Sequence, residues 1–371
     1  MKLCCYFNYA PLYRQSVYEA IDKEFDTQFL FGKEVEYKKN SGIAKLDYSI
    51  FKKEPIEFEN KTILKHFLWR TKLIRQLFKG YDTFLITGDL SFSYIPFIIG
   101  CKLFNKRIYG WGHGPKSKNG FLGPIYWWIL KQMTGFLTYG EGGKKRLIEL
   151  GYKPEKVCTI YNSLNRKKNS SLLSLESNII SDHFKNDFPT LLFIGRLTPQ
   201  KRIDILIKIS AIHRAQGINY NLLIIGDGIE ANTLHKLSEI NSLQDRIWFY
   251  GECYDEERLN ELIYNCDLCC SPGNVGLTAL HAMTYGVPVI SNDDFETQMP
   301  EYETILPQKT GMLFKKDNYD DLAGKILYWI TNFTGTKKRA EIRQNCYEMI
   351  NGKWNSDNQI SILKRVLGSG K

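Results

Sequence analysis

The chain has 371 residues, of which 43% are hydrophobic and 24% are charged. This composition excludes a disordered chain, and the length predicts two domains rather than one core. The net charge of +10 is uneven, because residues 1–165 carry 26 Lys and Arg against 15 Asp and Glu, and the remainder carries 24 against 25. A basic first half favours an anionic partner, such as a membrane surface, a nucleic acid or an anionic acceptor, although a solvated basic surface explains it equally well.

The cysteines and apolar runs bear on the compartment. Adjacent cysteines at 4–5 and 269–270 lie in apolar, strand-like runs and are poor disulfide partners. The N-terminus has no secretory signal pattern, so we expect a reducing, cytoplasmic location. No second cluster with ligand spacing accompanies Cys266, Cys269 and Cys270, which favours buried thiols over a metal site. No apolar run reaches transmembrane length, and the aromatic stretch 121–133 fits a core-facing or a membrane-interface helix.

The first half alternates short apolar runs with longer amphipathic patterns. These patterns predict strands at 1–7, 82–88, 107–112, 135–140 and 156–162, and helices at 14–25, 62–78, 122–134 and 141–150. The polar, Ser- and Asn-rich stretch 166–187 then predicts a linker.

The second half restarts the same alternation. It predicts strands at 190–195, 221–228, 246–251, 267–272 and 287–291, with helices at 201–217, 229–240, 255–265, 276–285, 318–333, 338–350 and 356–367. Such alternation indicates parallel sheets covered by helices on both faces. We therefore predict an α/β fold with two doubly wound, Rossmann-like domains. Their predicted bounds are 1–165 and 188–349, and a C-terminal helix within 350–371 is expected to pack back on the first domain.

Ligands of doubly wound sheets bind beyond the carboxyl ends of the strands. This rule selects seven loops as candidate binding segments: 8–14, 87–91, 112–115, 195–201, 226–228, 251–254 and 271–278.

One of these loops carries two cations. In GRLTPQKR (195–202), Arg196 directly follows a predicted strand and Lys201 lies at the start of the next helix. A planar guanidinium and a compact ammonium together suit a phosphate. The alternative is that both are surface cations on a turn.

A second loop predicts an anion-binding helix start. SPGNVGLTALHAMTYGVPVI (271–290) contains no carboxylate, only His281. The N–H groups of Gly276, Leu277 and Thr278 are expected to point at the ligand, with the helix dipole behind them. Neither a dinucleotide fingerprint nor a Walker pattern is present, so an NAD pyrophosphate or a P-loop triphosphate is not expected.

Four segments of the second half together resemble a known family. In order, FIGRLTPQKRIDILI, LLIIGDG, RIWFYGECYDEERLNELIYNCDLCCSP and GLTALHAMTYGVPVI resemble the C-terminal half of family 4 glycosyltransferases, of the "glycosyl transferases group 1" type. The resemblance covers residues 188–335 and extends more weakly to NYAPLYR, WGHG and IYNSLN in the first half. It implies the GT-B fold, in which two Rossmann-like domains face each other across a nucleotide-sugar cleft.

The resemblance also implies roles for individual residues. Arg196 and Lys201 match cations that bind the donor diphosphate, and His113 matches a histidine near the reacting carbon of the sugar; these three are the implied catalytic residues. The diphosphate is further held by the amides of Gly276, Leu277 and Thr278. The implied nucleoside contacts are Gly226, Gly251, Cys253 and His281, the further sugar contacts are Asn274 and Val275, and the acceptor contacts are Asn8, Tyr13, Arg14 and Lys116.

The chain departs from the family at two positions. The family usually has glutamates at the positions of Gly273 and His281, and the second usually holds the ribose. A glycine-rich loop after the first strand is also replaced, by NYAPLYR. Some branches of the family use an Asn-Val-Gly-Leu version of the site, so these departures do not by themselves indicate an inactive protein.

The resemblance implies a retaining, metal-independent glycosyltransferase that needs no cofactor. It would move a sugar from a nucleotide-diphosphate sugar to a glycan or a lipid-linked acceptor in bacterial surface polysaccharide synthesis, with peripheral contact to an anionic membrane. A non-catalytic nucleotide-sugar binder and a GT-B sugar-nucleotide epimerase stay open as alternatives. Nucleic-acid binding is disfavoured, because the basic residues are dispersed and no basic helix or aromatic platform accompanies them.

Overall fold

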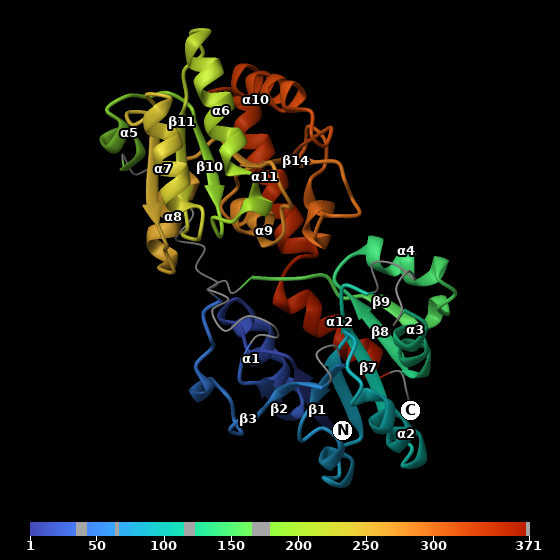
Figure 1. Ribbon diagram of the computed structural model, residues 1–371. Helices are drawn as coiled ribbons and strands as arrows, with labels where there is room; N and C mark the ends of the chain where they lie inside the picture. The colour runs from blue at the N-terminus through green and yellow to red at the C-terminus, as the bar shows by residue number, and fades with distance from the viewer. Residues whose placement is uncertain (35–42, 64–66, 115–122, 165–178, 369–371) are drawn as a thin grey trace. The chain divides into compact units, whose positions relative to one another are not determined.

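The computed structural model describes residues 1–34, 43–63, 67–114, 123–164 and 179–368. The chain divides into two compact units, residues 1–166 with 354–371, and residues 167–353 (Figure 1). Each unit contains one parallel sheet. The prediction of an α/β fold with two parallel-sheet domains is therefore confirmed. The predicted linker lies partly outside the described residues, and helix α5 (Ile179–Phe184) occupies its end.

The first unit is built on a seven-stranded sheet with the order β3-β2-β1-β6-β7-β8-β9. The strands are β1 (Lys2–Phe7), β2 (Asp26–Gly32), β3 (Ile56–Phe58), β6 (Thr83–Thr87), β7 (Arg107–Gly112), β8 (Gly135–Thr138) and β9 (Val157–Thr159). Its helices include α1 (Gln15–Glu24), α2 (Tyr94–Leu103), α3 (Gly123–Gln132) and α4 (Glu141–Glu149). Side chains alternate along β1, so that Leu3, Cys5 and Phe7 pack with α1 while Cys4 and Tyr6 pack with α2 and α3.

The last helix, α12 (Ser356–Gly368), belongs to the first unit and packs against α1 (Figure 1). Gln359 fixes it: its Nε2 donates to the Tyr161 carbonyl at 2.9 Å, and its Oε1 accepts from the Ser163 hydroxyl at 2.6 Å. The Tyr161 and Trp354 rings meet edge to face at 5.2 Å. Residues 353–355 separate α12 from the preceding helix, α11 (Lys337–Gly352).

The helix predicted over 62–78 is wrong in the described residues. The chain instead forms an antiparallel hairpin, β4 (Asn60–Ile63) with β5 (Phe67–Arg70), followed by the 3-10 helix η3 (Ile74–Phe78). Arg70 is buried and its Nη1 donates to Asp89 at 2.7 Å, and it also donates to the Tyr94 hydroxyl. A buried guanidinium needs a carboxylate partner, and this tertiary requirement outweighs the helical periodicity of the segment.

The second unit has a six-stranded sheet with the order β12-β11-β10-β13-β14-β15, the order of a doubly wound fold. The strands are β10 (Thr190–Ile194), β11 (Asn221–Ile225), β12 (Ile247–Gly251), β13 (Leu268–Ser271), β14 (Val289–Asn292) and β15 (Gly311–Phe314). Its further helices are α6 (Ile203–Ala215), α7 (Ala231–Ile240), α8 (Glu256–Tyr264), α9 (Leu277–Thr284) and α10 (Tyr319–Phe333). Strands β2, β3 and β15 were missed by the sequence patterns.

Within the described ranges, no helix is both long enough and apolar enough to cross a membrane.

Candidate functional site

The two cations predicted to bind phosphate lie close together at the carboxyl end of β10. Arg196 is exposed on the loop after this strand, and Lys201 is half-buried in the 3-10 helix Pro199–Lys201. Burial, together with the neighbouring charge of Arg196, lowers the pKa of Lys201 to about 8. The two positive charges therefore repel each other, and a bound anion would stabilise the charged form of Lys201.

The start of α9 meets Lys201 at the same edge of the sheet. Gly276 precedes the helix with φ 52°, and the Lys201 ammonium lies 4.0 Å from the place that a Cβ on Gly276 would occupy. Thr278 ties the helix to β10, since its hydroxyl donates to the Ile194 carbonyl at 2.8 Å. The first N–H groups of a helix have no intrahelical acceptor. Gly276, Leu277 and Thr278 thus present donors beside a cation.

The loop between β13 and α9 is pressed against the Lys201 segment. The Lys201 ammonium donates to the Asn274 carbonyl at 2.7 Å, and the Gly273 N–H donates to the Lys201 carbonyl at 3.1 Å. A Cβ at Gly273 would lie 1.9 Å from the Gln200 carbonyl oxygen, closer than atoms can approach. A glutamate cannot occupy position 273 in this backbone, which gives a physical reason for the departure seen in the sequence.

Gln298 holds this loop in place, and the sequence patterns missed it. Its Oε1 accepts from the Val275 N–H at 2.8 Å, and its Nε2 donates to the Ser291 hydroxyl at 3.0 Å and to the Asn292 carbonyl at 3.1 Å. Asn292 in turn donates to the carbonyls of Pro272 and Gly273, both at 2.9 Å. A polar run, NDDFETQ, directly follows the strand predicted at 287–291. This polar run at a strand end was the sequence feature that could have identified Gln298.

The two predicted sugar contacts on this loop differ in character. Val275 is fully buried, so its side chain packs in the core beneath the loop and is not exposed to a ligand. The side-chain Oδ1 of Asn274 is buried and has no hydrogen-bond partner within the described part of the chain. A buried acceptor without a partner costs stability unless a ligand or water satisfies it. Asn274 can therefore accept a hydrogen bond from a ligand hydroxyl.

The predicted nucleoside contacts lie at the ends of β11 and β12 and on α9. The Gly226 N–H donates to the Gly251 carbonyl at 2.8 Å, and a Cβ at Gly226 would lie 2.0 Å from the Gly195 carbonyl oxygen, so the three turns pack closely. Cys253 is half-buried just after β12. Burial lowers the pKa of His281 to about 4. The imidazole is therefore neutral near pH 7 and offers one donor and one acceptor.

In the first unit, the predicted residues gather at the carboxyl ends of β1, β7 and β8. His113 is exposed after β7, and its ring meets that of Tyr139 edge to face at 4.9 Å. Arg14 is buried, donates to the Tyr139 hydroxyl and lies 5.7 Å from the Trp111 ring centre. Arg14 thus orients Tyr139, which in turn packs against His113.

The remaining candidates for acceptor binding are Asn8, Tyr13 and Lys116. The Asn8 N–H donates to the Thr87 hydroxyl at 3.0 Å at the carboxyl end of β1. Tyr13 is half-buried in the 3-10 helix Leu12–Arg14. Lys116 lies outside the described residues.

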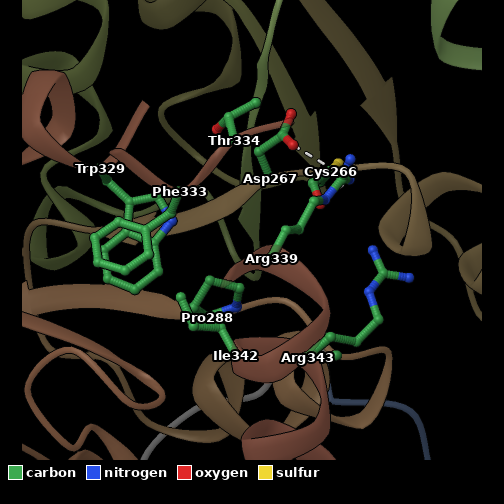
Figure 2. A pocket seen from close by; sticks show the side chains of 10 residues that line it. Cys266, Asp267, Pro288, Trp329, Phe333, Thr334, Arg339, Ile342 and Arg343 are labelled. Carbon is green, nitrogen blue, oxygen red and sulfur yellow. Dashed lines mark hydrogen bonds and ion pairs between the residues drawn. The ribbon is translucent and has the colours of Figure 1, made fainter. Parts of the chain in front are cut away.

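A small pocket of the second unit lies at the opposite end of its sheet (Figure 2). Cys266 and Asp267 precede β13, and Arg339 of α11 forms an ion pair with Asp267 at 3.2 Å. The pocket has a volume of about 10 Å³, enough for about one water molecule and too little for a nucleotide. In the ranges that the structure describes, no group of three His, Cys, Asp or Glu side chains forms a candidate metal site.

Comparison with known proteins agrees with the fold. The Anabaena protein HepE (Alr3699), crystallised in complex with UDP, superposes with a TM-score of 0.73 over 100% of both chains at 18% identity. The architecture is the GT-B fold of glycosyltransferases. Residues 176–349 match the family model "Glycosyl transferases group 1". The match covers 174 of the 371 residues, a little under half of the chain.

Two curated relatives match parts of the chain. The chain is 24% identical to the lipopolysaccharide 1,6-galactosyltransferase of Salmonella typhimurium, over 51% of this chain and 50% of the relative. It is 26% identical to the poly(ribitol-phosphate) α-N-acetylglucosaminyltransferase of Staphylococcus aureus, over 43% of this chain and 33% of the relative. The matches span between 33% and 63% of the length of the curated relatives.

The lowered pKa of Lys201 predicts pH-dependent binding of nucleoside diphosphates. Below pH 8 the ammonium is charged and the anion binds fully; above pH 8 binding must first return a proton to Lys201. Affinity should fall by up to about tenfold per pH unit above that value. Titration calorimetry across a panel of bases measures it. Lys201→Arg keeps its charge and should flatten the profile; an identical slope in this variant would contradict the assignment.

The contacts of Gln298 predict a loss of affinity in Gln298→Ala. The substitution leaves the Val275 N–H without its acceptor and removes the Gln298 amide that donates to Ser291 and Asn292, so the loop before α9 loses its fixed geometry. Affinity for nucleoside diphosphates should fall by about 1–3 kcal/mol. Gln344→Ala, on the exposed face of α11, is the matched control. If folded Gln298→Ala binds nucleoside diphosphates as tightly as folded Gln344→Ala, Gln298 does not position the site.

Proposed function

We propose that the protein is a retaining, metal-independent glycosyltransferase that moves a sugar from a nucleotide-diphosphate sugar to a glycan or lipid-linked acceptor. The observation that carries this proposal is the Lys201 ammonium held at the N-terminus of α9, next to Arg196. Two cations and a row of amide donors suit a diphosphate, the leaving group of this reaction.

Charge development at the leaving group explains how the site would act. As the bond between the sugar and the diphosphate breaks, negative charge grows on the leaving phosphate oxygen. Arg196, Lys201 and the amides of Gly276 to Thr278 stabilise that charge without a metal ion, because they are already oriented toward it. The leaving phosphate then takes the proton of the acceptor hydroxyl on the same face of the sugar, which retains the configuration at the reacting carbon.

The donor sugar and the nucleoside would meet different residues. Asn274 accepts a hydrogen bond from a sugar hydroxyl, which satisfies its buried Oδ1. His113 contacts the sugar near its reacting carbon. His281, being neutral, holds one ribose hydroxyl where the family glutamate holds two.

The names of the relatives support the acceptor class. One relative is named for lipopolysaccharide, a lipid-linked glycan, and another for poly(ribitol-phosphate), a polymer of a sugar-alcohol phosphate. The UDP bound by the Anabaena protein supports a nucleoside diphosphate as the leaving group. We therefore assign the protein to surface polysaccharide synthesis, with the acceptor bound by the first unit around Asn8 and Tyr13.

Arg196→Ala tests the proposed function. Removing one charge-assisted contact to the leaving group should lower kcat/KM by about 1.5–3 kcal/mol, roughly tenfold or more, while the exposed position preserves the fold. Transfer is measured as nucleoside diphosphate release with a panel of nucleotide sugars and surface-glycan acceptors, in excess chelator throughout. Arg214→Ala, on the same unit, is the control. Activity that needs added magnesium or manganese, or an inverted product by NMR, would overturn the mechanism.

His113→Ala should reduce kcat more than nucleotide affinity. The side chain lies at the carboxyl end of β7 and is proposed to meet the sugar, whereas the diphosphate is held by the second unit. Saturating kinetics give the rate, and calorimetry with the nucleoside diphosphate gives the affinity. A normal rate at saturation with weakened nucleotide binding would move His113 to the nucleotide site.

A further inference from the structure

Exposed apolar side chains gather on one surface of the first unit. In the second unit, Ile212 lies on α6, whereas Ile229 and Ile240 lie at opposite ends of α7, so these strongly exposed apolar residues are dispersed. In the first unit, five exposed residues fall on two neighbouring helices and the residue that ends one of them: Ile74, Phe78, Ile99, Leu103 and Phe104. We call these five residues the α2–η3 patch. Single exposed apolar residues need no explanation, but a contiguous group does.

Packing between α2 and η3 makes the patch continuous. Leu77 of η3 fills the space above Gly100 of α2, where a Cβ would lie 2.4 Å from Leu77 Cδ1. The Phe78 and Phe104 rings meet edge to face with centres 5.4 Å apart. Ile99 and Leu103 are four residues apart and so share the outer face of α2. Phe78 and Leu103 protrude most, with 70% and 77% exposure.

The segments that form the patch carry only positive charge. Residues 71–80 and 94–107 contain no Asp or Glu, and their basic residues are Lys72, Arg75, Lys79, Lys102, Lys106 and Arg107. Lys102 reaches Gln132 of α3, where Lys131 also lies. A nearby carboxylate, that of Asp82, accepts from the Lys2 N–H at 2.8 Å. Each protruding apolar segment thus has basic residues beside it in the chain, such as Arg75 and Lys79 next to Phe78.

We propose that the α2–η3 patch docks the protein on an anionic lipid bilayer. Phe78 and Leu103 insert among the upper acyl chains, and the surrounding Lys and Arg side chains bind the lipid headgroup phosphates. The patch suits a bilayer because its contiguous apolar side chains protrude from segments whose charged residues are all basic. This binding is interfacial and involves no spanning helix.

The position of the patch separates docking from donor binding. η3 precedes β6 and α2 precedes β7, so Phe78 and Phe104 lie near the amino ends of these strands. His113 follows the carboxyl end of β7, at the other end of the sheet. Changes in the patch should therefore leave the donor site intact. The inference stands independently of the reaction that the protein catalyses.

Vesicle co-sedimentation of the full chain tests the proposal. The wild type should bind vesicles of equal parts phosphatidylcholine and phosphatidylglycerol, and bind phosphatidylcholine alone far more weakly. The double variant Phe78→Ser/Leu103→Ser, and separately Arg75→Glu/Lys79→Glu, should each lower partitioning by at least about tenfold. Raised salt should weaken binding of the wild type, because it screens the headgroup charge.

Matched substitutions on the second unit serve as controls. Ile229→Ser/Ile240→Ser removes equally exposed apolar groups, and Lys236→Glu/Lys309→Glu reverses two exposed charges. Both should bind vesicles like the wild type. Melting temperature reports whether each variant is folded. The proposal fails if the wild type ignores anionic vesicles, if either patch variant binds as the wild type does, or if gel filtration shows that the patch joins two copies of the chain instead.

Discussion

The backbone contact between Gly273 and the segment 200–201 sets the geometry on which the rest of the donor site depends. Gly273 lies so close to the Gln200 carbonyl that no side chain fits at this position, and its N–H donates to Lys201. This contact turns the Asn274 carbonyl toward the Lys201 ammonium and brings the start of α9 beside it. A carboxylate at position 273 is incompatible with the contact, so here the family's charged residue is replaced by backbone packing.

This exchange changes the electrostatics of the site. A glutamate would partly neutralise Arg196 and Lys201, whereas a glycine adds no charge. The buried Glu301 raises the pKa of Lys201, in opposition to burial and Arg196. Burial and Arg196 dominate, so the free ammonium is less stable than one in water. An anion that binds between the cations relieves this cost. The site should therefore favour an anionic ligand over a neutral one, even though Arg196 is exposed to solvent.

The sequence was informative where a local rule governs the structure. The alternation of strands and helices predicted the two parallel sheets, and the residues at the strand ends predicted the group around Arg196, Lys201 and Gly276. The sequence patterns failed where distant residues decide the structure: the 62–78 segment is periodic like a helix, yet the pairing of the buried Arg70 with Asp89 favours a hairpin. Gln298 was missed for the same reason, because its partners are set by the folding of two loops and not by spacing.

The proposed reaction alters the charge that the site must hold. Cleavage of the sugar–phosphate bond leaves a nucleoside diphosphate with about one further negative charge near neutral pH. The cations and the helix amides therefore bind the product more tightly than the donor, which by itself would slow product release. The neutral His281 acts in the opposite direction, since it makes fewer hydrogen bonds to the ribose than a carboxylate. On the proposed function, we infer that a looser hold on the nucleoside offsets the tighter hold on the diphosphate, so that a strongly cationic clamp remains compatible with turnover.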